Sequence, residues 1–213
     1  MPPLAAPETS TRILDIAERL VQTRGFNAFS YADIAAALHV TKATLHYHFP
    51  TKADLGNRLI ERYQTGFLAA LGRIDESRRD AGAKLKAYVG IYTDVLDDDR
   101  MCLCGMLAAD YITLPPTMRD AVRRFFDANE AWLGEALQRG REKNELAFAG
   151  SPVEAAQVLV GALEGAMLLA RSHGDAARFR SAACRLLADL GVPTQAPNIG
   201  APGIVKLTAW IAQ

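Results

Sequence analysis

Apolar residues recur every three or four positions through most of the chain, and no segment alternates convincingly between apolar and polar residues. The first pattern is typical of amphipathic helices and the second of half-buried strands. A long helix is predicted over residues 11–24, because its apolar stripe ends at Gly25, a residue that commonly follows a helix. Further helical segments are predicted at residues 51–74, 82–96, 117–143, 152–173 and 175–190. The fold class is therefore predicted to be all-α, with about nine helices.

Three helix starts follow one another within residues 30–54. Ser30, Thr41 and Thr51 each stand directly before a helical segment, and their hydroxyl groups can accept a hydrogen bond from the first turn. Ser30 and Thr51 are each followed three positions later by an aspartate, which completes a capping box. Short, closely coupled helices of this kind are typical of helix-turn-helix DNA readers, which present a helix N-terminus to the major groove. The recognition helix is predicted over residues 42–49.

The order of residues in this region resembles the amino-terminal domain of the TetR/AcrR family of transcriptional regulators. The resemblance rests on residues 13–17, 25–26, 34–38, 41–49, Lys52 and Leu55. His39 stands in the turn where the family usually has glycine, and His46 stands in the recognition helix where it usually has tyrosine. Histidine tolerates a left-handed backbone better than most residues, so the turn is expected to form. The imidazole of His46 keeps a hydrogen-bond donor but has a shorter reach than tyrosine.

Within the predicted recognition helix, Leu45 is expected to face inward, and five other side chains are expected to face DNA. These are Lys42, Ala43, Thr44, His46 and Tyr47. A lysine can donate to guanine O6 and N7, and a threonine methyl can meet a thymine methyl. The resemblance further implies contacts to the DNA backbone from Ser30, Tyr31, Thr41, Tyr47 and Lys52. An ordinary helical hairpin with Lys42 and Thr44 on a solvated face remains the alternative.

The segment from Met101 to Met106 contains Cys102 and Cys104. A cysteine followed by a short apolar helix and then an acid, here Asp110, is similar to one branch of the family, which has a cysteine at the start of the sixth helix. In that branch the cysteine can sense oxidants or electrophiles, and Cys102 matches it. Two residues apart is too close for an unstrained disulfide within a helix, so a sulfenate, an adduct or a bond to a partner chain is expected. Core packing of both thiols is the alternative, since free cysteine is among the most buried residue types.

The resemblance also implies an effector pocket inside a carboxy-terminal bundle, and a homodimer. The residues expected at the effector or redox-sensing site are Cys102, Cys104, Met106, Tyr111, Phe125, Phe126 and Trp132. A plain helical core contains the same residue types at the same spacing. The residues expected at the dimer interface are Gly161, Gly165, Leu186, Leu187 and Leu190. Small residues let a second helix approach closely, but packing within one chain is again the alternative.

The length of 213 residues suits a DNA-reading module with a larger second domain. We predict a helix-turn-helix domain over residues 8–55, an effector-binding and dimerisation domain over 56–192, and a tail of unknown role over 193–213. Lysine plus arginine and aspartate plus glutamate number 24 each, so the chain lacks the basic footprint of a nonspecific nucleic-acid binder. DNA affinity would then come from a few placed contacts that symmetry doubles, which favours a dimer.

Other features argue against membrane, secreted and metal-dependent classes. The longest apolar run, residues 153–170, is interrupted by polar residues, and the first residues lack the pattern of a secretion signal. Three cysteines are too few for a disulfide scaffold. His46 and His48 point to different faces of a helix, whereas metal-binding pairs prefer a spacing of four. We expect a cytoplasmic protein with no cofactor, no metal and no membrane partner.

The sequence thus predicts a homodimeric transcriptional regulator, not an enzyme, that binds double-stranded operator DNA of pseudo-palindromic sequence. We expect a repressor that a small molecule or a thiol-reactive compound releases. Two alternatives stay open. A thiol oxidoreductase would use Cys102 and Cys104, although the chain shows no βαβ pattern and no paired general base. A helical protein-interaction module that has lost DNA binding would be consistent with His39 and His46.

Overall fold

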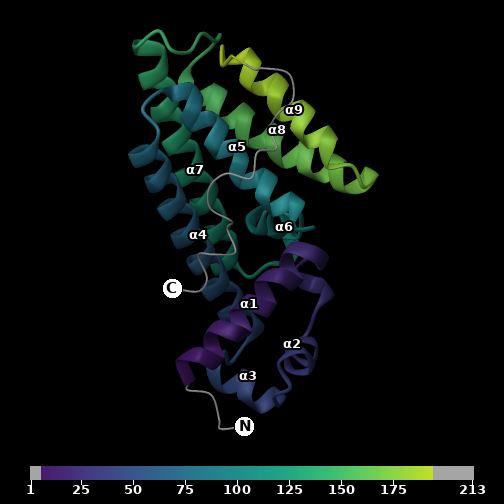
Figure 1. The fold of residues 1–213 in the computed structure, drawn as a ribbon. Helices are drawn as coiled ribbons and strands as arrows, with labels where there is room; N and C mark the ends of the chain where they lie inside the picture. Colours follow the sequence, from purple (N-terminus) through teal and green to yellow (C-terminus); the bar gives the residue numbers. More distant parts are fainter. Residues whose placement is uncertain (1–5, 194–213) are drawn as a thin grey trace. The chain divides into compact units, whose positions relative to one another are not determined.

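The computed structural model describes residues 6–193, and every regular element in that range is a helix (Figure 1). The prediction of an all-α fold is confirmed. The predicted tail, residues 193–213, lies outside the described residues from 194 onward. The protein divides into two compact units, which are described separately below: residues 1–65 with 102–125, and residues 66–101 with 126–213.

The first unit contains the predicted DNA reader. Its elements are α1 (Ala6–Arg24), the short 3-10 helix η1 (Phe26–Ala28), α2 (Tyr31–Leu38), α3 (Lys42–His48), the first half of α4 (Lys52–Ser77), α6 (Leu103–Ala109), the 3-10 helix η2 (Tyr111–Thr113) and the start of α7 (Pro116–Glu142). Helix α1 packs on η1, α2 and α6. Residues 102–125, which the sequence placed in the effector domain, therefore pack with the DNA reader.

The three predicted helix starts are confirmed. Ser30 and Asp33 form a complete capping box on α2, and the Thr41 hydroxyl accepts an amide hydrogen bond from the first turn of α3. At α4, the Thr51 amide donates to the Asp54 carboxylate at 3.0 Å, and the Asp54 amide donates to the Thr51 hydroxyl at 3.1 Å. Each reciprocal pair satisfies amides that a helix N-terminus otherwise leaves without a partner. Local hydrogen bonds therefore stabilise the first turn of each of these helices.

The turn between α2 and α3 forms with histidine in place of glycine, as predicted. His39 has φ 55° and ψ 42°, in the left-handed region, and its amide donates to the last turn of α2. This ends α2 and lets the chain reverse direction. The two short helices contact each other, and Ile34 of α2 and Leu45 of α3 are both 0% exposed, so the reader has its own small core.

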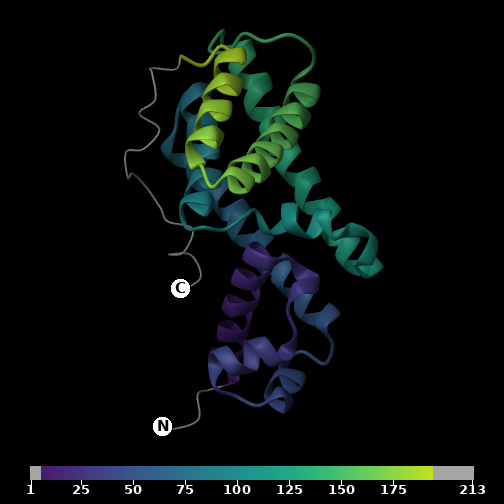
Figure 2. The same ribbon diagram turned by 90° about the vertical axis from the view of Figure 1, so that its right-hand side faces the viewer.

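The second unit is a helical bundle. Its elements are the end of α4, α5 (Ala81–Asp97), most of α7, α8 (Pro152–His173) and α9 (Ala176–Asp189). Helices α8 and α9 lie side by side in Figures 1 and 2, and α5 packs on both. Fully buried residues from these helices form the core, among them Leu85, Tyr88, Leu133, Leu163 and Phe179.

Helix α8 has an apolar face that the described part of this chain leaves uncovered. Its most apolar 18-residue window has a mean hydropathy of 1.5, so length and composition alone would allow it to cross a membrane, but only 33% of that window is buried. One such helix is weak support for a membrane span, because helices of soluble proteins pass the same test. Val158, Leu168 and Leu169 are 64%, 53% and 62% exposed, which is unusual for large apolar side chains on one helix.

Candidate nucleic-acid interface

Helix α3 presents the predicted recognition face to solvent. Its inward side is anchored by Leu45 and by Phe49 at the C-terminal cap, which are 0% and 6% exposed. The outward side carries the residues predicted to read DNA, all exposed except the half-buried Thr44: Thr41, Lys42, Ala43, Thr44, His46 and Tyr47. Tyr47 is 79% exposed, so its ring and hydroxyl are available to a partner. The contacts of these residues with DNA stay predictions.

His46 is exposed, but one side of its ring is engaged within the chain. Its Nδ1 donates to the carbonyl oxygen of Pro50 at 3.1 Å, since a carbonyl oxygen can only accept. Its ring lies 4.8 Å from the ring of Tyr31, tilted by 55°. Nε2 is therefore the ring nitrogen left to meet DNA.

Tyr31, predicted to meet the DNA backbone, is buried inside the reader. Its hydroxyl donates to the carbonyl oxygens of Phe49 and Thr51, at 2.8 and 2.7 Å. Burial, with a smaller contribution from the negative charge of Asp54, raises the pKa of Tyr31 to about 12. In this structure the hydroxyl links α2 to the connection between α3 and α4. A phosphate contact would have to replace these bonds.

Lys52, also predicted to hold a phosphate, points into the reader as well. Its ammonium donates to the carbonyl oxygens of Phe26 and Phe29, at 2.6 and 2.5 Å, and lies 4.6 and 4.3 Å from the centres of their rings. Burial lowers the pKa of Lys52 below its ordinary value, and the carboxylates of Asp110 and Asp33 partly offset that shift. Ser30, by contrast, is exposed at the start of α2, where its hydroxyl donates to Asp33.

The thiols of Cys102 and Cys104 are buried, with 3% and 0% exposure. Cys102 is the N-terminal cap of α6, where its sulfur accepts the amide of Gly105 at 3.5 Å and the hydroxyl of Tyr63 at 3.9 Å. Two donors directed at one sulfur stabilise a thiolate more than a thiol. The burial of both thiols also fits the core-packing alternative. An oxidant would therefore have to reach Cys102 through a local opening of the first unit.

The other residues predicted at the effector site belong to both units. Met106, Tyr111 and Phe125 lie in the first unit, where Phe125 is fully packed at 1% exposure and Tyr111 is 39% exposed under the Arg119 guanidinium. In the second unit Phe126 is half-buried, and the Trp132 ring stacks on Tyr88 and donates its Nε1 hydrogen to Asp75 at 2.8 Å. Tyr111, Phe125 and Trp132 therefore each contact another side chain of their own unit, Phe125 through the ring of Tyr63.

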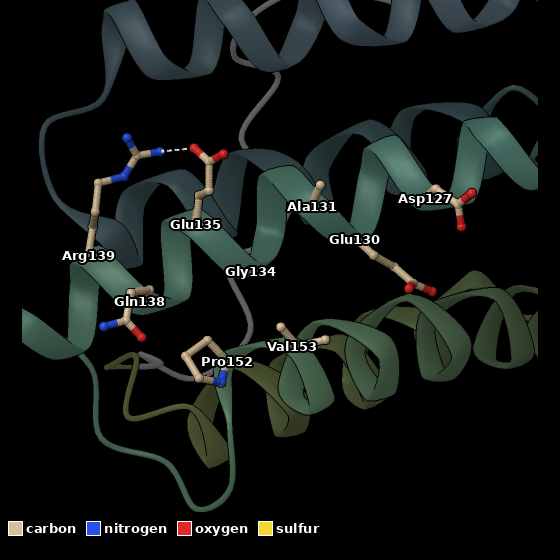
Figure 3. A pocket seen from close by; sticks show the side chains of 9 residues that line it. All are labelled: Asp127, Glu130, Ala131, Gly134, Glu135, Gln138, Arg139, Pro152 and Val153. Carbon is tan, nitrogen blue, oxygen red and sulfur yellow. Dashed lines mark hydrogen bonds and ion pairs between the residues drawn. The ribbon is translucent and has the colours of Figure 1, made fainter.

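A groove of about 670 Å³ between α7 and α8 was not foreseen from the sequence (Figure 3). It is lined by Asp127, Glu130, Ala131, Gly134, Glu135, Gln138, Arg139, Pro152 and Val153. Glu135 and Arg139 form an ion pair at 3.2 Å, whereas Glu130 extends toward α8 in Figure 3. The polar residues of α7 read as an ordinary solvated helix face in the sequence, because nothing local shows that α8 starts beside them. None of the predicted effector residues lines this groove.

The predicted dimer residues separate into two groups. A side chain added at Gly161 or Gly165 would meet no atom within 4 Å, so this smooth stretch of α8 faces open space. Leu187 and Leu190, in contrast, are 1% and 7% exposed and belong to the core of a single chain. Both are buried within the second unit, where α9 packs on α5 and α8, and their place at a dimer interface stays a prediction. Leu186 is half-buried.

Two segments of the chain match descriptions of known families. Residues 13–59 match "Bacterial regulatory proteins, tetR family", and residues 81–186 match "Tetracyclin repressor-like, C-terminal domain". A solved TetR-family regulator from Agrobacterium tumefaciens is 32% identical, with a TM-score of 0.85 over 87% of this chain and 99% of that one. A TetR regulator from Legionella pneumophila is 33% identical, with a TM-score of 0.77 over 89% and 100%.

A further relative is the transcriptional repressor NemR of Escherichia coli K12, which is 27% identical over 170 residues, or 77% of this chain and 84% of NemR. The fold, the exposed recognition helix and these matches define a helix-turn-helix transcriptional regulator. The chain belongs to the TetR family. The predicted family resemblance is thereby confirmed. This family comprises DNA-binding regulators, so the chain is a regulator and the oxidoreductase alternative is rejected.

Proposed function

We propose that this TetR-family protein is a cytoplasmic repressor that binds a pseudo-palindromic operator as a homodimer. One observation carries the proposal: α3 exposes Lys42, Ala43 and Tyr47 while Leu45 fixes its other side in a small core. A helix held in this way can enter the major groove without unfolding. Similarity to the repressor NemR supports repression rather than activation.

The uncovered face of α8 supports the homodimer. Gly161 and Gly165 allow a close approach, and Leu168 and Leu169 offer apolar surface that water solvates poorly. In a homodimer, a two-fold axis places the same patch of each subunit against the other. One contact would then cover the apolar faces of both α8 helices. Such a dimer places two reader units on one operator. Each placed contact is then doubled.

The finer placement, in the branch of the family with a cysteine at the start of the sixth helix, rests on Cys102. Cys102 caps α6, and the solved structure of E. coli NemR, 25% identical, is described as its reduced form. A thiol-reactive effector would modify Cys102, or a small molecule would bind the second unit, and either would lower operator affinity. Because α6 packs on α1, a larger group at the Cys102 sulfur would disturb the reader directly.

A selection of genomic DNA fragments tests the proposal. The purified, reduced protein would be incubated with fragments of the source genome at near-physiological salt, and bound fragments sequenced. Enrichment of a short inverted repeat is expected. Lys42→Ala combined with Thr44→Ala should weaken binding to that repeat about a hundredfold or more, because both base contacts are lost in each half-site. The control Lys86→Ala removes an exposed lysine from α5 and should leave binding unchanged.

A folded dimer that enriches no sequence would contradict the proposal. Recovery of enrichment by His39→Gly with His46→Tyr would then identify a reader disabled at those two positions, and the protein would be a helical interaction module.

A further inference from the structure

The segment just before α2 is held by hydrogen bonds from a distant part of the first unit. Both the Phe26 amide and the Asn27 amide donate to one carboxylate oxygen of Asp110, at 2.9 and 3.4 Å. The Asn27 side chain also donates to the Thr113 hydroxyl at 2.8 Å. Asp110 is the C-terminal cap of α6, so the end of α6 grips η1 across 84 positions of sequence.

The same segment is held from its carbonyl side by Lys52. Its ammonium donates hydrogen bonds to the carbonyl oxygens of Phe26 and Phe29. It also forms cation–π contacts with the rings of both residues. Phe26 and Phe29 are 6% and 5% exposed, and their edge-to-face contact is 5.9 Å between ring centres. A cation and a carboxylate therefore enclose η1 between them.

This enclosure constrains the short path by which the chain passes from α1 to α2. The chain leaves α1 through Gly25, whose φ of 89° is accessible mainly to glycine, and enters α2 at Ser30. A side chain at Gly25 would lie 3.3 Å from the Asp110 carboxylate, so the backbone and the carboxylate are in close contact here. Within this short path η1 has few ways to reorient unless Lys52 or Asp110 releases it.

We propose that Lys52 and Asp110 form a charged clamp on η1 that positions the DNA reader, and that Lys52 acts from inside the reader instead of as a ligand of the DNA phosphates. The inference rests on the proposed function, because a positioned reader matters only if it reads DNA. It assigns to α6 the task of fixing the entry to α2 through Asp110. The clamp also predicts that removal of either charge, the ammonium of Lys52 or the carboxylate of Asp110, weakens operator binding.

The salt dependence of operator binding separates the two roles of Lys52. A lysine on a phosphate displaces counterions, so its loss lowers the slope of log K against log salt by about 0.9 per contact, or about 1.8 for a dimer. A positioning lysine leaves that slope unchanged. Lys52→Met is expected to weaken operator binding about tenfold or more with no change in slope. A slope lower by about 1.8 would overturn the proposal and restore the phosphate contact.

The direction in which operator affinity changes when Asp110 loses its charge gives a second test. Removal of a negative charge from a DNA-binding protein strengthens DNA binding if the charge acts only through its field. Asp110→Asn removes the charge and keeps the shape, and the clamp requires weaker operator binding, by about tenfold. Asp120→Asn is the matched control, since Asp120 lies on α7 in the same unit with an exposed side chain. Unchanged or stronger binding by Asp110→Asn would overturn the clamp.

Hydrogen exchange tests the clamp without DNA. In the full-length protein, Asp110→Asn should speed exchange of the Phe26 and Asn27 amides about tenfold, because each loses a bond to a charged acceptor. Lys52→Met should speed exchange of the same amides, while amides in α9 keep their rates in both variants. Equal rates in the variants and the wild type would overturn the clamp. Failure of the wild type to select DNA, with faster exchange in the variants, would instead contradict the proposed function alone.

Discussion

At the residue scale, two side chains that the sequence predicts to contact DNA, those of Tyr31 and Lys52, form hydrogen bonds within the protein. Tyr31 and Lys52 have the donors that a phosphate contact needs, and the sequence cannot distinguish that use from an internal one. In the structure both side chains donate to backbone carbonyl oxygens of the reader. Buried donors need such partners, because leaving one without an acceptor costs about 1–3 kcal/mol. Lys42 and Tyr47, in contrast, are exposed on α3.

Tyr31 leads to a prediction about alkaline stability. Its phenol ionises near pH 10 in the unfolded chain and near pH 12 in the folded one. Its contribution to stability is therefore complete below pH 10 and is lost as the pH rises from 10 to about 12. Tyr31→Phe should lower the free energy of unfolding by about 1–3 kcal/mol at neutral pH, and the gap from the wild type should narrow between pH 10 and 12.

Urea denaturation at a series of pH values measures this gap. Tyr47→Phe serves as the control, since Tyr47 is 79% exposed and its hydroxyl should add nothing to stability. A gap that is constant from pH 7 to pH 12 would contradict the interpretation.

At the element scale, the bounds of the helices were largely readable from the chain. Ser30, Thr41, Thr51 and Ser151 mark starts by chemistry within one turn, so no distant contact is needed to place them. Which helices pack closely is a different matter. Glycines inside α7 look alike in the sequence, but a side chain at Gly140 would lie 2.5 Å from Leu146 and 2.6 Å from the Ala81 side chain, whereas one at Gly134 would meet nothing within 4 Å.

These two glycines give opposite predictions on one helix. Gly140→Ala should destabilise the protein by about 1–3 kcal/mol, because the new methyl group collides with Ala81 in a packed interior. Gly134→Ala should stabilise it by about 0.5–1 kcal/mol, because alanine lowers the entropy of the unfolded chain and the site has room. Thermal unfolding of the two variants checks the signs. A loss of stability in Gly134→Ala equal to that in Gly140→Ala would contradict the difference in packing between the two sites.

At the scale of the whole molecule, the exposed apolar side chains of α8 are the surface on which the proposed homodimer depends. Leu168 and Leu169 remain uncovered by the described residues, although α8 is the one helix among these residues that is long and apolar enough, by length and composition, to cross a membrane. Leu169→Glu should convert the proposed dimer to a folded monomer, because each interface would then bury two like charges. Operator affinity should fall about a hundredfold or more, since the two readers are no longer linked.

Sedimentation at micromolar concentration, with circular dichroism to verify folding, measures this effect. Ile112→Glu is the matched control, because Ile112 is 83% exposed and lies in the first unit. A dimer that persists in Leu169→Glu would place the interface elsewhere.

The sequence by itself determined the all-α fold, the starts of the reader helices, the left-handed turn at His39 and the outward face of α3. Each depends on residues within one or two turns of one another, where helical periodicity and capping chemistry act directly. Only the tertiary structure decided that Lys52 and Tyr31 bond inward, that Leu187 and Leu190 serve one chain's core, and that Asp110 holds η1. Those roles depend on which helices meet in space, and local periodicity carries no record of contacts 84 positions apart.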